Sequence, residues 1–539
     1  MKQFKLMAMM FIALTCCFFT SCSDDDDNTE AAISKFVLSQ SSITLSPEGT
    51  ETLACTFFPD NISNKEVSWK SSDESVATVS GGVVTALKPG SAVITATPAA
   101  NTALAQSCTV TVAMNTMEVS GKVEGTWTAY TTVTVKGQLE VAEGKSLTIE
   151  EGVEVLFNSA DAEGTGIEFT VNGNIYCQGT AEAPVVFSIP EAERKFDNVL
   201  NKKNLWGGFM LNNSATNAEA LFSHCVIEYT GSPMTDKSPS VIAGIYTAGE
   251  DDGVQITTSA QFKGNLVVEH SIIRNGFADG IYMQGGKGII THNVFACNGA
   301  TGGEAVNVKA GTSTTVAYNV MYSPNTNGLK LSSSGQDDAA GRAQSKCVAY
   351  NNTIVNAGWR RDGVKGGCIY VEKNILANVF NNLMVNCKYR AMAPKWGTPG
   401  VKDGCDDKSV IDYNCYISGS IVSDFKQDQE EGAIKTPFEG YTSKNKDYAD
   451  AIDAHSIWAK AAKDIDIAFA NFPYDTNKLS NTSFDGSWDF SVTSMTDGAT
   501  DGASLMTLGD MDYAKQGLTV GGKEYKAETP QKFFGAYGK

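Results

Sequence analysis

The phrase that decides the fold of this chain reads His270-Ser271-Ile272-Ile273-Arg274-Asn275, and it returns five more times before residue 419. The later copies read His292-Asn293-Val294-Phe295, Tyr318-Asn319-Val320-Met321, Tyr350-Asn351-Asn352-Thr353-Ile354-Val355-Asn356, Phe380-Asn381-Asn382-Leu383-Met384-Val385-Asn386 and Tyr413-Asn414-Cys415-Tyr416-Ile417. They follow one another at intervals of 22 to 33 residues, which is typical of stacked repeats that cannot bury their apolar faces alone. Each copy is a run of β-forming residues that ends in Asn or Gly, so it predicts strands and turns rather than helices.

A second strand follows the phrase in most copies, and the two strands together predict a parallel β-helix. The second strands are Gly280-Ile281-Tyr282-Met283, Ala305-Val306-Asn307-Val308, Gly328-Leu329-Lys330-Leu331 and Gly367-Cys368-Ile369-Tyr370-Val371. In such a fold each coil hydrogen-bonds to the next at a spacing of about 4.8 Å, and alternate side chains point into the core. Two columns are expected to stack along the axis, one of His224, His270 and His292 and one of Asn293, Asn319, Asn351, Asn381 and Asn414.

Length, charge and cysteine usage bound the rest of the chain. The 539 residues are enough for two or three domains, and only 19% of them are charged, which suits β-rich structure. The net charge of −19 argues against a nucleic-acid partner, because neutralising phosphates requires a basic surface. The cysteines that follow residue 22 are spread singly, so no metal site is predicted, and those in the coil strands are expected to be small buried apolar side chains.

The N-terminus has the pattern of an export signal. Lys2 and Lys5 precede the apolar stretch 6–19, which is too short to span a bilayer. Thr20-Ser21-Cys22 resembles the lipobox of bacterial lipoproteins, and Ser23-Asp24-Asp25-Asp26-Asp27 resembles the signal that exports such lipoproteins to the cell surface. The resemblance implies a signal peptide at 1–21, lipidation of Cys22, an acidic tether at 22–32 and an outer-membrane protein exposed on the cell surface. The alternative for the acidic run is a flexible spacer.

Residues 33–114 contain seven short β runs, which predict an immunoglobulin-like sandwich. The runs Val67-Ser68-Trp69-Lys70-Ser71-Ser72-Asp73-Glu74-Ser75-Val76-Ala77-Thr78-Val79 and Gly82-Val83-Val84-Thr85-Ala86-Leu87-Lys88-Pro89-Gly90-Ser91-Ala92 resemble the group 2 bacterial immunoglobulin-like domain. The resemblance implies a spacer or adhesive module without catalysis. The sequence leaves open whether Cys55 and Cys108 pair.

The β-helix is expected to occupy residues 115–425. Its first part, with Leu147-Thr148-Ile149 and Val153-Glu154-Val155-Leu156-Phe157, resembles the initial coils of right-handed parallel β-helix proteins of bacteria, which have the pectin lyase-like fold. Residues 426–539 are expected to form a last coil and a cap, with a helix over 448–472 covering the open end of the solenoid. The predicted fold class is therefore all-β throughout, with a capping C-terminal segment.

The candidate ligand-binding site lies in the turns that follow the fourth and fifth phrases. When Asn351 is aligned with Asn381, aromatic and basic side chains coincide on adjacent coils, and two further residues lie close in sequence. The candidates for glycan binding are Trp359, Arg360, Tyr389, Arg390, Lys395 and Trp396. Aromatic rings stack on sugars and guanidinium groups bind carboxylates or sulfates, so the predicted partner is an acidic polysaccharide. The alternative is that these are ordinary loop residues.

Two other functions remain open at the level of sequence. The first is a polysaccharide lyase acting on uronate-containing glycans, which needs a base and a cation. Candidate bases are Arg360, Arg361, Lys365, Arg390 and Lys395, and candidate calcium ligands are Asp362, Asp403, Asp406 and Asp407. The second is an adhesin or structural display protein. No cofactor is expected apart from calcium in a lyase, and a glycoside hydrolase is disfavoured because no pair of Asp residues occupies the coil strands.

Overall fold

The computed structural model divides the chain into two compact units, residues 1–113 and 114–539. It describes residues 32–159, 165–336, 341–361, 368–388, 392–394, 405–406, 408–417, 454–459, 469–473, 481–492 and 497–538. Within these residues no helix is long and apolar enough to cross a bilayer.

The first unit is the predicted β-sandwich. Its strands are β1 (Lys35–Leu38), β2 (Ser42–Leu45), β3 (Thr50–Thr52), β4 (Cys55–Phe58), β5 (Val67–Ser71), β6 (Ala77–Ser80), β7 (Val83–Ala86), β8 (Gly90–Pro98) and β9 (Gln106–Val112). The sheet β2-β9-β8-β5 faces the sheet β3-β7-β6 across a core that includes Val84, Ile94 and Val110. Cys55 and Cys108 are free thiols that belong to different apolar clusters, so they do not pair.

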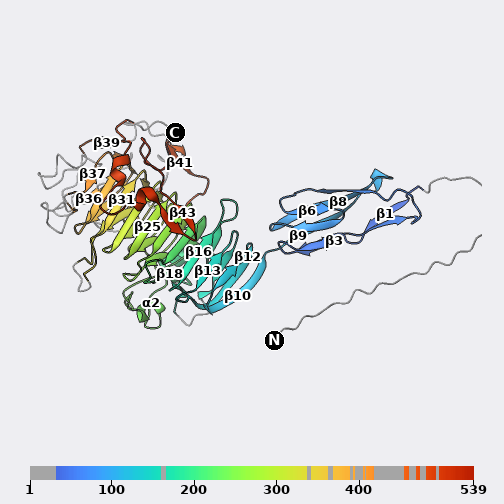
Figure 1. The fold of residues 1–539 in the computed structure, drawn as a ribbon, viewed down its shortest axis with the longest axis horizontal. Coiled ribbons are helices and arrows are strands. Elements are labelled where there is room, and N and C mark those ends of the chain that lie inside the picture. Colours follow the sequence, from blue (N-terminus) through green and yellow to red (C-terminus); the bar gives the residue numbers. More distant parts are fainter. Residues whose placement is uncertain are drawn as a thin grey trace, which may run out of the picture. The chain divides into compact units, whose positions relative to one another are not determined.

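The second unit is a parallel β-helix whose coils each contribute up to three strands. The strands fall into three parallel ladders that run the length of the unit, seen as the stack from β10 (Asn115–Lys122) to β39 (Ile457–Ala459) in Figure 1. Strand β12 (Thr131–Val141) takes part in two of these ladders, because its first part pairs with β14 (Glu154–Phe157) and its last part pairs with β15 (Glu168–Val171). The predicted β-helix is therefore confirmed.

The three ladders are named A, B and C. Ladder A contains β14 (Glu154–Phe157), β17 (Val185–Ser188), β20 (Cys225–Glu228), β23 (Ile272–Arg274), β26 (Val294–Ala296), β29 (Val320–Tyr322), β32 (Thr353–Val355), β35 (Leu383–Val385), β38 (Cys415–Ile417) and β39 (Ile457–Ala459). Ladder B contains β15 (Glu168–Val171), β18 (Gly208–Leu211), β21 (Ile256–Thr258), β24 (Ile281–Met283), β27 (Val306–Val308), β30 (Leu329–Ser332), β33 (Ile369–Glu372) and β36 (Met392–Pro394). Ladder C contains β11 (Gly125–Trp127), β13 (Ser146–Ile149), β16 (Asn174–Gln178), β19 (Glu219–Ser223), β22 (Asn265–Glu269), β25 (Gly286–Thr291), β28 (Thr312–Ala317), β31 (Lys346–Tyr350), β34 (Leu376–Phe380) and β37 (Val410–Ile411).

A left-handed residue makes the tight corner between ladders C and A in coil after coil. The corner residues have φ between 48° and 56° and are His224, His270, His292, Tyr318, Asn351, Asn381 and Tyr413. Asn and His tolerate this conformation better than most residues, which explains their recurrence in the phrase. The predicted histidine column is confirmed, because the rings of His224, His270 and His292 stack at centroid distances of 4.9 and 5.0 Å.

The residue after each of the last five of these corners belongs to a buried amide ladder. It consists of Asn293, Asn319, Asn352, Asn382 and Asn414, and each Nδ2 in the first four donates to the next Oδ1 over 2.9 to 3.0 Å. The predicted ladder was wrong at Asn351 and Asn381, which sit one position earlier, at the corner itself. The reason is the strand register, because Tyr350 pairs with Ala317 rather than with Tyr318. Asn352, and not Asn351, therefore corresponds to Asn319.

The described C-terminal residues lie along the sides of the β-helix. The cap expected over its open end stays a prediction, since much of that segment lies outside the described residues. Residues 497–538, here called the strap, run beside ladder C, with β43 (Lys523–Tyr525) near β16 in Figure 1. Tyr318 Oη and Tyr350 Oη donate to strap carbonyls over 2.7 and 2.5 Å, and Met506, Leu508 and Met511 pack on the same ladder. The strap also contains α3 (Tyr513–Gln516) and β42 (Leu518–Val520).

Ladder A is covered by the segment before the strap. Phe472, Phe490 and Val492 pack on its outer side together with Phe534 of the strap. This segment contains β40 (Phe469–Asn471) and β41 (Asp489–Val492), and β39 extends ladder A itself. The helix predicted over 448–472 is therefore wrong where the structure describes it, because these apolar residues join sheets.

Candidate functional site

The outer side of ladder B carries polar and aromatic side chains in register. In β24, β27, β30 and β33 of this ladder, the residues on either side of one central position belong to the core, so the residue at that position points outward. The strand pairing places the middle residues in one column, which consists of Thr257, Tyr282, Asn307, Lys330 and Tyr370. Since adjacent coils are about 4.8 Å apart, Tyr282 and Tyr370 are separated by roughly 14 Å along the axis.

A pair of buried carboxyl groups lies beside this column, at the start of β24 and β27. Asp279 and Glu304 are only 8% and 9% exposed. The Asp279 carboxylate accepts the backbone N–H of Glu304 and Asn307 Nδ2, each over 2.8 Å. Burial and the neighbouring Glu304 raise the pKa of Asp279 well above its usual range.

The pKa of the second carboxyl group, that of Glu304, shifts in the opposite direction. Burial raises the pKa of Glu304, but the hydrogen bond with Asp279 and the charges of Lys330 and Lys309 outweigh burial and lower the pKa overall. The two shifts have opposite directions, so a proton held by the pair favours Asp279 and the negative charge favours Glu304.

Two lysines stand over the two tyrosines of the column. Lys309 Nζ lies 5.5 Å from the centroid of the Tyr282 ring, and Lys330 Nζ lies 5.7 Å from that of Tyr370. Lys330 also lies 3.7 Å from a carboxylate oxygen of Glu372. Burial, followed by the charge of Lys330, lowers the pKa of Lys309. These side chains form a mixed aromatic and charged surface across consecutive coils, here called the ladder B face.

A pocket of about 300 Å³ opens at one end of the ladder B face. One wall is the long loop between β20 and β21, which contains α2 (Pro239–Ile242) and contributes Tyr246 and Asp251. The other wall is the start of β24, with Asp279 and Tyr282. The hydroxyl of Tyr246 lies 2.5 Å from Thr257 Oγ1, which fixes its ring against ladder B.

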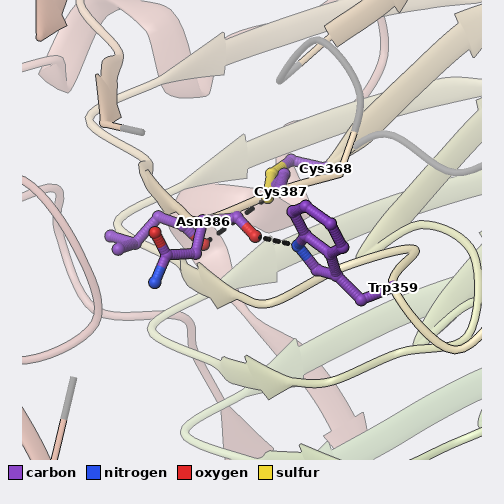
Figure 2. Close-up of a disulfide and its surroundings, with 5 residues drawn as sticks. Trp359, Cys368, Asn386 and Cys387 are labelled. Atoms are coloured by element: carbon purple, nitrogen blue, oxygen red, sulfur yellow. Dashed lines mark hydrogen bonds between the residues drawn. A yellow bond between two sulfur atoms is a disulfide. The ribbon is translucent and has the colours of Figure 1, made fainter. Parts of the chain in front are cut away.

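Trp359, which was predicted to bind glycan, is held against the next coil. Its Nε1 donates to the carbonyl of Asn386 over 2.5 Å, beside a disulfide between Cys368 and Cys387 (Figure 2). The indole donor is therefore already paired within the protein. The disulfide corrects the prediction that Cys368 and Cys387 are both plain apolar side chains, because the register brings their Cα atoms to 6.1 Å.

Arg360 is tied to the backbone of the two preceding coils. Its guanidinium donates to the carbonyls of Asn298 (2.6 Å), Gly299 (2.6 Å) and Ser323 (2.8 Å). Its Cζ lies 5.4 Å from the ring centroid of Phe196, which belongs to α1 (Phe196–Leu200). The geometry gives Arg360 a structural role, and its role in glycan binding stays a prediction.

Most of the other predicted residues fall outside the described part of the chain. These are Tyr389, Arg390, Lys395 and Trp396 of the glycan site, Lys365 among the bases, and Asp362, Asp403 and Asp407 among the calcium ligands. Asp406 is described, and its carboxylate accepts Gln344 Nε2 over 2.8 Å. In the described residues, no three His, Cys, Asp or Glu side chains are grouped to hold a metal ion.

Asp279 and Glu304 were not among the residues predicted from the sequence, although the repeat contains a signal for them. Aligning the second strands of successive coils places Asp279, Glu304 and Asn327 at one position, three residues before the outward residue. Asp279 and Glu304 lie in the turn that leads into each strand, so the prediction of no Asp pair within the coil strands did not apply to them.

Comparison with known proteins agrees with this architecture. Residues 32–110 match the bacterial Ig-like domain (group 2), residues 119–264 a pectate-lyase-like β-helix domain, and residues 248–405 the right-handed β-helix region. Two curated proteins match short segments. An uncharacterised protein of Clostridium acetobutylicum is 41% identical over 16% of this chain, and an α-L-arabinofuranosidase of Bifidobacterium longum is 44% identical over 13% of it.

The match spans 9% and 7% of the length of these two relatives, so their names describe far longer proteins. The domain matches cover the described sandwich and most of the ladders. The chain therefore carries a group 2 bacterial Ig-like domain followed by a pectate-lyase-like right-handed β-helix.

Proposed function

We propose that this protein binds carbohydrate along the ladder B face. One observation carries the proposal: Tyr282 and Tyr370 project from the same column, each with a lysine over its ring, beside a pocket. Half-buried aromatic rings offer apolar surface to a sugar ring, and a few fixed polar groups supply orientation. Described segments pack on the outer sides of ladders A and C, which favours ladder B as the binding side.

The comparisons support a carbohydrate ligand without naming one. The β-helix match is described as pectate-lyase-like, and one relative is named an α-L-arabinofuranosidase. The ammonium groups of Lys309 and Lys330 suit an anionic substituent such as a uronate carboxylate, which keeps an acidic polysaccharide as the proposed ligand.

Replacing the two tyrosines tests this proposal. We expect Tyr282→Ala and Tyr370→Ala each to weaken binding to a glycan identified on an array at least ten-fold, which is about 1.4 kcal/mol. Isothermal titration calorimetry measures the effect, and Phe58→Ala in the first domain is the control, since Phe58 is an exposed aromatic residue outside the β-helix. Unchanged affinity in both tyrosine variants would remove the ladder B face from consideration. If no glycan binds at all, a function as an adhesin or structural display protein is favoured over carbohydrate binding.

A lyase is the second candidate, and Lys309 favours it. Its pKa is lowered by burial and it lies beside the Asp279–Glu304 pair, so it is the described lysine best suited to remove a proton. A lyase would produce an unsaturated, ultraviolet-absorbing product from uronate-containing glycans. A rise in absorbance during incubation with such glycans would favour this candidate over binding alone.

The proposal also includes a lipid anchor at Cys22 and display on the outer surface, with the Ig-like domain as a stalk. We expect a Cys22→Ser variant expressed in the native type of cell to lose incorporation of labelled fatty acid and to leave the membrane fraction, because attached acyl chains hold such a protein to the bilayer. Metabolic labelling and fractionation measure this, with Cys17→Ser as the control. Labelling that persists in Cys22→Ser would refute the anchor.

A further inference from the structure

The histidine column at the corner between ladders C and A is not required by the corner itself. Its rings, those of His224, His270 and His292, are nearly parallel, with interplanar angles of 14° and 5°. Later coils place Asn351 and Asn381 at the same corner, with the same left-handed backbone. Asparagine therefore satisfies the turn, and the imidazoles add a property that asparagine lacks, which is the ability to bind a proton near neutral pH.

The strap covers one end of this column. The ring of His292 lies between those of His270 and Tyr318, at centroid distances of 5.0 and 5.1 Å. Its Nε2 lies 3.8 Å from a carboxylate oxygen of Glu528 in the strap, and only 17% of its side chain is exposed. His270 also has a ring on each face and yet is exposed, so we attribute the burial of His292 to the strap.

The same stretch of the strap is fastened to the neighbouring coils. Tyr318 Oη donates to the carbonyl of Thr529 over 2.7 Å, and Tyr350 Oη donates to that of Glu528 over 2.5 Å. The side chain of Glu528 faces His292 while its backbone is held by Tyr350. A charge on His292 therefore acts directly on an anchored part of the strap.

The charged groups around the column come from the strap, from ladder C and from the turn before β17. The acidic groups that act on the histidines are Glu528, Glu269 and Glu182. The basic group is Lys523 of the strap, which acts on His224. Glu524 and Lys526 of the strap pair with one another at 2.7 Å.

Burial outweighs these carboxylates at both ends of the column. Burial, followed by the charge of His270, lowers the pKa of His224. Burial also lowers the pKa of His292, although the carboxylate of Glu528 opposes this shift. Because the strap buries His292, this histidine binds a proton more weakly with the strap in place than in water. The attachment of the strap is therefore strongest above about pH 6.5, the ordinary pKa of histidine, and weakens as the pH falls through the lowered pKa of His292.

We propose that the histidine column is an acid-sensitive latch, which loosens the strap over residues 518–529 when His270 and His292 are protonated. Two imidazolium rings at 5.0 Å repel each other, and loosening of the strap gives His292 access to water. Loosening also uncovers Leu221 and Val267 of ladder C, on which β42 and β43 pack. The inference goes beyond carbohydrate binding and does not depend on it.

Hydrogen–deuterium exchange on the full chain tests the latch. Between about pH 7.5 and about pH 5.5 histidines titrate, whereas carboxylates stay ionised. We expect the protection factors of residues 518–529, corrected for the intrinsic pH dependence of exchange, to fall at least about three-fold over this range. The double variant His270→Asn with His292→Asn should abolish the fall, and asparagine keeps the left-handed corner as it does at Asn351.

Two further variants make the result specific. His455→Asn removes the remaining histidine of the chain, which lies outside the column and pairs with Asp412 at 2.6 Å, and it should leave the fall unchanged. Glu528→Gln removes the carboxylate that favours a proton on His292 with the strap in place, so it should enlarge the fall. Equal protection at the two pH values, or a fall that persists in the double variant, would overturn the latch. The Glu528 side chain is 62% exposed, so Glu528→Gln still tests the sign if the double variant fails to fold, and a smaller fall in that variant would also refute the proposal.

Discussion

An Asn352→Ala variant is expected to lose about 3–5 kcal/mol of unfolding free energy. Asn352 is fully buried, and its Nδ2 donates to Asn382 Oδ1 and to the carbonyls of Val316 and Tyr350. Its Oδ1 accepts both the backbone N–H and the Nδ2 of Asn319. Alanine lacks the side-chain amide, so all of these hydrogen bonds are lost at once. Each buried polar group that is left unpaired costs about 1–3 kcal/mol.

Urea unfolding followed by far-ultraviolet circular dichroism measures this loss. The control is Asn201→Ala, which removes one exposed hydrogen bond from the same unit and should change the free energy by less than about 0.5 kcal/mol. A loss below about 1 kcal/mol in Asn352→Ala would show that the amide ladder is a consequence of the fold and contributes little to its stability.

Arg360→Ala should destabilise the β-helix by about 2–4 kcal/mol, because three backbone carbonyls lose a charged donor. The side chain also packs over Phe196, so alanine leaves a gap at that contact. Differential scanning calorimetry would record the loss as a lower midpoint for the β-helix transition.

The conservative variant Arg360→Lys separates charge from geometry. A lysine keeps the charge but lacks the planar fork that reaches several carbonyls, so it should recover less than half of the lost stability. If Arg360→Ala instead leaves the thermal midpoint unchanged and abolishes glycan binding, the original prediction of a glycan site at this turn is favoured over a structural role.

The fold could be predicted far better than the site, and the corner residues show why. A left-handed conformation at a tight corner favours Asn and His. The coils could therefore be recognised from neighbouring residues in the phrases around His270, His292 and Asn351. The amide ladder was nevertheless misassigned at two coils, because Tyr350-Asn351-Asn352 offers two registers that differ by one residue. Only the pairing of whole strands selects between them.

The candidate site is made of residues that are far apart in the sequence and are brought together by the fold. Asp279 and Glu304 lie in different coils, and neither has a local motif, so their proximity follows from the stacking of β24 on β27. The disulfide between Cys368 and Cys387 also depends on the stacking of the coils, because the sequence around each cysteine resembles that of the other strand cysteines.

The sequence by itself determined the sandwich, the repeat and the all-β class, because alternation, turn residues and period are properties of neighbouring residues. The tertiary structure alone decided which sides of the β-helix the described C-terminal residues cover. Ladders A and C are covered by the C-terminal residues, whose contacts join Tyr318 to Thr529 and Asn265 to Thr519 across more than two hundred residues. Such contacts depend on where the chain returns after the coils are built, and no local pattern encodes that path.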